Sequence, residues 1–205
     1  VNIHAVERFI GDQAIEHGWA PKHDAKPSKK TVLIIGAGPS GLSAAYHLTR
    51  FGHKVTIYEA GPVAGGMMSF GIPAYRLPRN IIEAEVKRIL DTGIELKLNH
   101  KVENVEHEMK TGNFDACFLA IGAHLAKRIN IPTPDTSKIL DAAGVLREME
   151  TGKNPPKLGR RVVVYGGGDT AVDVARTAKR LGAEETIIVY RSGPGQMKAH
   201  DFEVK

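Results

Sequence analysis

The sequence has 205 residues, of which 42% are hydrophobic and 25% charged, a globular composition with enough apolar residues for one domain or slightly more. The net charge of +5 comes from scattered basic residues, which indicate a solvated surface compatible with anionic cofactors and argue against a nucleic-acid interface. No apolar run reaches the ~20 residues of a membrane helix and no signal peptide is visible, so we expect a cytoplasmic protein. Cys117 is the single cysteine, which excludes a disulfide framework and an iron–sulfur cluster held by this chain alone.

The first predicted elements form a β-α-β unit. An amphipathic pattern predicts a helix at 4–17, and a polar linker with two prolines follows it. In chain order we then expect a buried strand at 31–36, a helix at 40–51 and a strand at 54–60. The long irregular loop that comes next is of the kind that carries function in compact domains.

The later elements repeat that opening. We expect a helix at 79–91, strands at 94–99 and 115–123, and a helix at 137–150. A second unit then follows, with a strand at 161–166, a helix at 169–182 and a strand at 185–191. The duplication predicts an α/β fold with two dinucleotide-binding domains, each a parallel sheet flanked by helices, the second of them incomplete. The expected division is an N-terminal helix and linker, a first Rossmann-like domain, a connecting segment and the start of a second Rossmann-like domain, at 1–30, 31–125, 126–158 and 159–205.

A G-x-G-x-x-G fingerprint lies between the first strand and its helix. Gly36 permits the tight turn, Gly38 lets a pyrophosphate approach the backbone, and Gly41 allows close packing of helix and strand. Free N–H groups at the helix N-terminus favour an anion there. Glu59, at the end of the next strand, can accept hydrogen bonds from both hydroxyls of a ribose. A glycine turn that only packs a helix onto a sheet would not require this acid, so the pattern predicts a dinucleotide-binding site.

A G-x-G-x-x-A fingerprint occupies the same place in the second unit, at Gly166, Gly168 and Ala171. Here the next strand closes on Arg191, whose guanidinium pairs well with a 2′-phosphate. The contrast between Glu59 and Arg191 predicts FAD at the first site and NADPH at this second site. A solvated cation at the end of a strand is the alternative interpretation of Arg191.

Five stretches together resemble the NADPH-dependent glutamate synthase small subunit and its relatives. They are VLIIGAGPSGLSAAYHL, VTIYEAGPVAGGMMSFGIPAYRLP, FDACFLAIGA, VVVYGGGDTAVDVARTAKRLGAEETIIVYR and MKAHDFE. The resemblance implies a two-domain flavoprotein in which electrons pass from NADPH to FAD, and then to iron–sulfur clusters in absent segments or to a partner subunit or fused domain. Hydride transfer between the two cofactors needs no protein nucleophile, so no catalytic residue and no metal ligand is predicted.

The resemblance also implies particular cofactor-binding residues. Those expected at FAD are Gly36, Gly38, Pro39, Ser40, Gly41, Glu59, Ala60, Gly66, Met67, Arg76, Leu77, Val102 (through its backbone), Ala120, Ile121 and Gly122. Those expected at NADPH are Gly166, Gly167, Gly168, Asp169, Thr170, Ala171 and Arg191.

Several departures from the family pattern leave alternatives open. Ser192 stands where the family usually has a second arginine, which weakens the prediction of NADPH and keeps an NADH-specific oxidoreductase as a rival. The family's cysteine-rich cluster domain, the rest of the nucleotide domain and the segment that completes the FAD site are absent. We therefore expect a middle piece of a longer protein, for which a non-catalytic nucleotide-binding fragment is the second alternative.

Four further residues carry smaller questions. Met67 and Met68 stand where one group of disulfide reductases has its cysteine pair, so that chemistry is excluded here, and Met67 is either a flavin-loop residue or core filler. Cys117 fits a buried core thiol better than a reactive one. His200 is either a solvated histidine or a group close to the nicotinamide.

Overall fold

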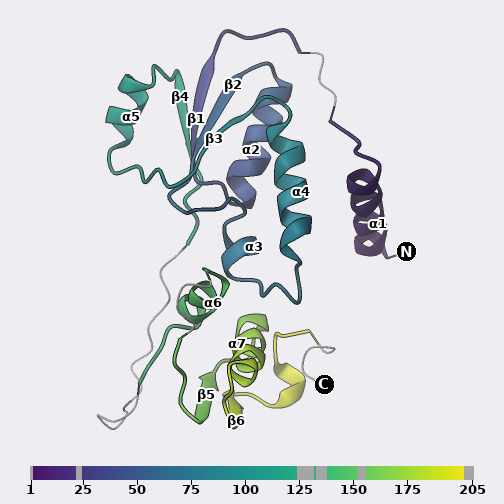
Figure 1. The fold of residues 1–205 in the computed structure, drawn as a ribbon, viewed down its shortest axis with the longest axis vertical. Coiled ribbons are helices and arrows are strands. Elements are labelled where there is room, and N and C mark those ends of the chain that lie inside the picture. Colours follow the sequence, from purple (N-terminus) through teal and green to yellow (C-terminus); the bar gives the residue numbers. More distant parts are fainter. Residues whose placement is uncertain (1, 22–24, 124–131, 133–137, 152–155, 201–205) are drawn as a thin grey trace. The chain divides into compact units, whose positions relative to one another are not determined.

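A computed structural model of the chain describes residues 2–21, 25–123, 132, 138–151 and 156–200 (Figure 1). The chain forms two compact units. Unit 1 comprises Val1–Met68 and Pro78–Gly122, and unit 2 comprises Ser69–Leu77 and Ala123–Lys205.

Unit 1 is built on a four-stranded sheet in which every pairing is parallel. The strands are β1 (Thr31–Ile35), β2 (Lys54–Tyr58), β3 (Glu95–Lys97) and β4 (Ala116–Leu119), in the order β3-β2-β1-β4. Reversal of the strand order at β1 creates the topological switch point at which α/β sheets bind ligands, outside the carboxyl ends of the strands.

Helices cover both faces of this sheet (Figure 1). Those of unit 1 and its boundary are α1 (Ile3–Glu16), α2 (Pro39–Arg50), α3 (Met67–Phe70), α4 (Arg79–Leu90) and α5 (Val105–Thr111). Helix α2 contacts β1, β2 and α4 on one face. On the other face Leu33, Ile35 and Tyr58 form a buried cluster against Val105 and Met109 of α5. Burial on both faces explains why β1 is an uninterrupted apolar run.

Unit 2 contains a smaller parallel sheet. Its elements are α6 (Ala142–Thr151), β5 (Arg161–Tyr165), α7 (Asp169–Arg180), β6 (Glu185–Val189) and the 3₁₀ helix η1 (Pro194–Gln196). Leu146 of α6 and Val164 of β5 pack against Ala171, Val174 and Ala175 of α7 to form its core. The two fingerprints therefore lie in two separate strand–turn–helix units, as the duplication predicts.

The structure differs from the predicted elements in a few places. The helix expected at 137–150 begins at Ala142, because the Asp141 carboxylate accepts from the amides of Ala143 and Gly144, at 3.2 and 3.0 Å, and so caps the helix at this point. Residue 137 itself, with much of the expected connecting segment, lies outside the described residues. Helix α5 was not predicted. It is seven residues long and is capped by Asn104, whose side chain accepts from His107 N at 3.0 Å.

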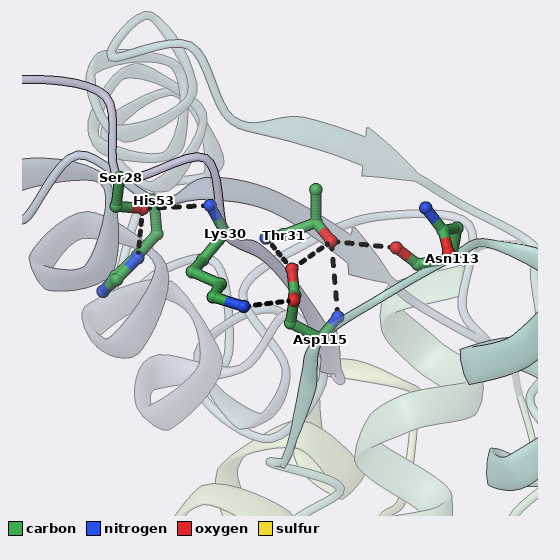
Figure 2. Close-up of polar contacts among 6 residues, drawn as sticks. All are labelled: Ser28, Lys30, Thr31, His53, Asn113 and Asp115. Atoms are coloured by element: carbon green, nitrogen blue, oxygen red, sulfur yellow. Dashed lines mark hydrogen bonds and ion pairs between the residues drawn. The ribbon is translucent and has the colours of Figure 1, made fainter.

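The amino edge of the unit 1 sheet is braced by a polar network (Figure 2). The Asp115 carboxylate accepts from Thr31 N at 2.8 Å, from the Thr31 hydroxyl at 3.1 Å and from Lys30 Nζ at 2.8 Å. Beside it, Ser28 Oγ lies 2.7 Å from Nδ1 of His53. These contacts join the starts of β1 and β4 at the edge opposite the ligand-binding one, which indicates a structural role.

None of the helices in the described part of the chain has both the length and the apolar character needed to cross a membrane.

Candidate functional site: two glycine turns at the carboxyl edges of parallel sheets

The first glycine turn lies where three loops converge at the carboxyl edge of the unit 1 sheet. Gly36 N donates to Tyr58 O at 2.8 Å, and Ala120 N donates to Ile35 O at 2.8 Å. The loop that follows β2 is joined to the same place, because Gly65 N donates to Ala37 O at 2.8 Å. Residues from three parts of the sequence thus meet at the edge where such sheets bind ligands.

Two glycines of this turn are required by packing. Gly36 has φ +107°, and a Cβ there would lie 2.4 Å from Ala120 O. A Cβ on Gly41 would lie 1.9 Å from Gly36 O, which no side chain tolerates. Their small size is what brings α2 close to β1 and β4, in agreement with the roles predicted for the first and third glycines.

Gly38 is different, because packing does not explain its lack of a side chain. Its φ is −78°, which any residue adopts, and the nearest atom to an added Cβ would be Gly66 Cα at 3.9 Å. Gly38 is the N-cap of α2, and no side chain caps this helix. The surface at Gly38 therefore presents open backbone at an uncapped helix N-terminus, which suits an approaching phosphate.

Glu59 holds its carboxylate directly beside the turn. Its two oxygens accept from Ala37 N and from Gly61 N, each at 2.7 Å. A carboxylate has about four lone-pair sites, so each oxygen can still accept a hydroxyl. The acid predicted to bind a ribose is thus fixed at the turn and keeps acceptor capacity.

The second glycine turn repeats this geometry in unit 2. Gly166 has φ +149° and donates to Val189 O at 3.0 Å. Gly168 is the N-cap of α7, again with no side-chain cap, and no atom lies within 4 Å of a Cβ added there. The middle glycine of both turns is therefore unconstrained by packing, and both helices begin without a side chain over their first amides.

The residues that border the second turn were not predicted, because no sequence pattern indicates them. A Cβ on Gly167 would lie 2.6 Å from the Tyr190 ring, so this ring packs against the turn. The Gly167 carbonyl accepts from Lys198 N at 2.8 Å and from Ala199 N at 3.1 Å. His200 N donates to Asp169 Oδ1 at 3.2 Å, and this histidine is exposed, which leaves its suggested proximity to the nicotinamide a prediction. The segment after β6 therefore folds back onto the second turn, through contacts made by residues that are not part of the fingerprint.

Arg191 follows β6 at the same edge of the sheet as the second turn, and its side chain is exposed. No ion-pair partner is recorded for it within the described ranges. An exposed guanidinium at this place agrees equally with a 2′-phosphate ligand and with a solvated cation, so its role stays a prediction.

The remaining predicted flavin residues do not all lie at the first turn. Gly66 does, with φ +53° and its α-carbon facing Gly38. Met67 is 43% exposed, which argues against core filler. Val102 packs against the buried cluster of unit 1. Arg76 and Leu77, which we expected in the first domain, are grouped with unit 2, where Arg76 Nη1 lies 2.8 Å from Asp173 Oδ2 of α7.

Cys117 has the character of a core thiol. Its side chain packs against the buried cluster of unit 1, and burial raises the pKa of the thiol above its usual value. A raised pKa keeps the sulfur protonated and unreactive. Within the described residues, no group of three or more His, Cys, Asp or Glu side chains is arranged to hold a metal ion.

Curated proteins with similar sequences match the whole chain. It is 40% identical over 211 residues to the NADPH-Fe(3+) oxidoreductase subunit beta of Geobacter sulfurreducens, covering 100% of this chain and 31% of that protein. It is 37% identical over 217 residues to the glutamate synthase [NADPH] small chain of Escherichia coli, covering 100% of this chain and 46% of that protein. The chain thus spans between 31% and 46% of the length of these relatives.

A solved structure with the same fold is Mycobacterium tuberculosis FprA in complex with NADPH. It superposes with a TM-score of 0.71 at 24% sequence identity, covering 87% of this chain and 46% of that one. At this identity the likeness establishes the Rossmann-like α/β fold alone.

The family model described as pyridine nucleotide-disulphide oxidoreductase matches residues 30–204, which include both glycine turns. The chain therefore belongs to the pyridine nucleotide-disulphide oxidoreductase family.

Proposed function

We propose that this chain is the FAD- and NADPH-binding part of an oxidoreductase of the glutamate synthase small-chain type. FAD binds at the first turn, with its pyrophosphate over Gly38 and a ribose on Glu59. NADPH binds at the second turn, with its pyrophosphate over Gly168 and its 2′-phosphate on Arg191. FAD, when bound, supplies the acceptor for a hydride from the nicotinamide, and the protein binds and orients the two rings.

The observation that carries this proposal is the state of the two middle glycines. Gly38 and Gly168 are the N-cap residues of α2 and α7, and no side chain caps either helix. Neither residue is required to be glycine by its φ or by a neighbouring atom. A ligand that approaches the backbone gives a reason for their lack of a side chain. The acid at Glu59 and the cation at Arg191 then distinguish the two ligands by charge.

The final electron acceptor is proposed to be an iron–sulfur cluster or a partner subunit. The two curated relatives are a beta subunit and a small chain, and their names differ in what is reduced. Nothing in the two turns selects among final acceptors, because both turns are proposed to bind cofactors that carry the electrons before they reach that acceptor.

The test is the absorbance of the purified protein after incubation with FAD and desalting, followed by anaerobic addition of NADPH. We expect retained bands near ~450 nm, the usual flavin region, and their bleaching by NADPH. Bleaching by NADH at the same rate as by NADPH would show that NADPH is not the preferred donor. Retention without bleaching would leave an FAD-binding module, and no retained flavin would refute the proposed function.

A further inference from the structure

The loop that follows β3 in unit 1 is bonded to the turn that carries Glu59. His100 N donates to Glu59 O at 2.9 Å, and Asn99 N donates to Gly61 O at 2.9 Å. Asn99 has φ +54°, a left-handed conformation that asparagine tolerates better than most residues. Gly61 N in turn donates to the Glu59 carboxylate at 2.7 Å. The backbone of residues 99–100 therefore supports the turn that holds the acid proposed to bind a ribose.

The side chain of His100 joins this loop to a strand and to a helix of the same unit. Its ring centroid lies 4.2 Å from that of Tyr58, which is buried at the end of β2. Its Nε2 lies 3.4 Å from Oε1 of Glu108, which belongs to α5. Val102, further along the loop, packs against the buried cluster that contains Tyr58. Through one imidazole the loop thus contacts both β2 and α5.

The contact between His100 and Glu108 depends on a proton. Nε2 is buried and has no hydrogen-bond partner among the described residues, because Glu108 Oε1 lies within ion-pair distance but outside hydrogen-bond geometry. A buried nitrogen without a partner is unfavourable. A positive charge on the ring makes the contact an attraction between opposite charges. Imidazole is the side chain whose ordinary change of charge falls between about pH 5 and pH 8.

Other titratable or charged groups surround the Tyr58–His100 pair without replacing this contact. They are Tyr58 and Glu59 from β2 and its end, Lys97 from β3, Cys117 from β4 and Lys101 in the loop itself. Both lysines have carboxylates of their own, because Lys97 lies 3.7 Å from Glu95 and Lys101 lies 3.2 Å from Glu103. Within the described ranges, the carboxylate recorded at ion-pair distance from His100 is that of Glu108.

We propose that His100 is a positioning residue of the FAD site, which holds the loop and the Glu59 turn in place through its contact with Glu108. The inference rests on the proposed binding of FAD at the first turn. A ligand that must order a loop binds less tightly than one that meets the loop already ordered. Protonation of His100 strengthens the contact, so FAD binds more tightly at lower pH. By linkage, bound FAD favours the protonated form of His100 to the same extent.

The test compares FAD binding by the unsubstituted protein, His100→Gln and Glu108→Gln at about pH 6 and about pH 8. The first variant cannot take up a proton at this position, and the second removes the charge but keeps the size of the side chain. In calorimetric titration with FAD, we expect the Kd of the unsubstituted protein to rise about threefold to fivefold over this range. The Kd of both variants should stay at its high-pH value throughout. His107→Gln, at an exposed position of α5, is the matched control and should follow the unsubstituted protein.

A second readout guards against misfolding of the variants. In Glu108→Gln at about pH 6, hydrogen exchange of the amides of Asn99 and His100 should quicken, while exchange in β1 and β2 should not. A Kd of the unsubstituted protein that is independent of pH, or a pH dependence that both variants retain, would overturn the positioning role and leave the proposed function standing. An unsubstituted protein that retains no FAD at either pH would refute the proposed function, and the role of His100 with it.

Discussion

The two glycine turns share one scaffold but differ in how tightly the helix sits on its strand. In unit 1 the third fingerprint position is Gly41, where a Cβ would lie 1.9 Å from Gly36 O. In unit 2 that position is Ala171, whose methyl lies 3.3 Å from where a Cβ on Gly166 would be. The second helix therefore leaves room for a methyl group that the first excludes. The same fingerprint tolerates alanine only where the helix is set slightly back.

The surroundings of the two turns differ as well. The first is enclosed by Ala120, Gly66 and the Glu59 carboxylate, which all come from the edge of one sheet. The second is bordered by Tyr190 and by the amides of residues 198–200, from the segment that follows β6. The comparison teaches that a fingerprint specifies the turn itself, while the walls of the site come from elsewhere in the chain.

The largest effect is expected from exchanging the third positions. Gly41→Ala should destabilise unit 1 by about 3 kcal/mol or more, because the methyl group meets a backbone oxygen that cannot move aside. Ala171→Gly should cost only about 1 kcal/mol, from lower helix propensity and one lost methyl. Urea denaturation followed by circular dichroism measures both. Equal losses would mean that the two helices sit at the same depth.

The middle positions should separate the two ligands without affecting folding. Gly38→Ala is expected to weaken FAD binding on the order of 100-fold, about 2.7 kcal/mol, because its methyl occupies the place of the pyrophosphate. Gly168→Ala should do the same to NADPH while FAD binding is kept. Calorimetric titration of each cofactor measures the effect, with Gly11→Ala, at an open position in α1, as the control. Loss of both cofactors in either variant would contradict the assignment of one ligand to each turn.

The charges beside the turns should set the choice of nicotinamide cofactor. Arg191→Ala is expected to raise the KM for NADPH roughly tenfold, about 1.4 kcal/mol, and to leave the KM for NADH unchanged, because only NADPH carries a 2′-phosphate. Steady-state rates with both donors measure the difference. Arg160→Ala, which breaks an exposed pair with Glu184 at the opposite edge of the same sheet, is the matched control. An unchanged preference in Arg191→Ala would show that this arginine is a solvated cation.

The amino edge of the unit 1 sheet supplies the smallest effect. Contacts with Lys30 and then Thr31 lower the pKa of Asp115 from 3.8 to about 2. A carboxyl whose pKa is lowered by folding stabilises the protein above its unfolded pKa and loses that contribution as pH falls through the folded one. The urea midpoint of the unsubstituted protein should therefore decline between about pH 4 and pH 2. In Asp115→Asn it should already be lower at pH 5 and should decline less.

The control for this pH series is Glu103→Gln, which removes an exposed carboxylate that pairs with Lys101 at 3.2 Å. Its midpoint should follow that of the unsubstituted protein. A parallel decline in Asp115→Asn would show that the network in Figure 2 does not brace the sheet.

The two strand–turn–helix units and the residues of each turn could be predicted from the amino-acid sequence. The signals that predict these units are local, because each reflects the geometry of consecutive residues. They are the apolar run of each strand, the glycines that follow it and the apolar periodicity of the next helix. The same signals placed Glu59 and Arg191 at strand ends. Element boundaries moved by a few residues where a cap such as Asp141 intervened.

The surroundings of the turns and the partner of Arg76 are visible only in the folded structure. Ala120 approaches Gly36, Tyr190 packs on Gly167 and Arg76 pairs with Asp173, and these partners are 84, 23 and 97 positions apart in the sequence. Such contacts leave no periodic or spacing signal, because they depend on how whole elements pack. For that reason the sequence assigned Arg76 to the first domain, while its guanidinium lies on a helix of unit 2.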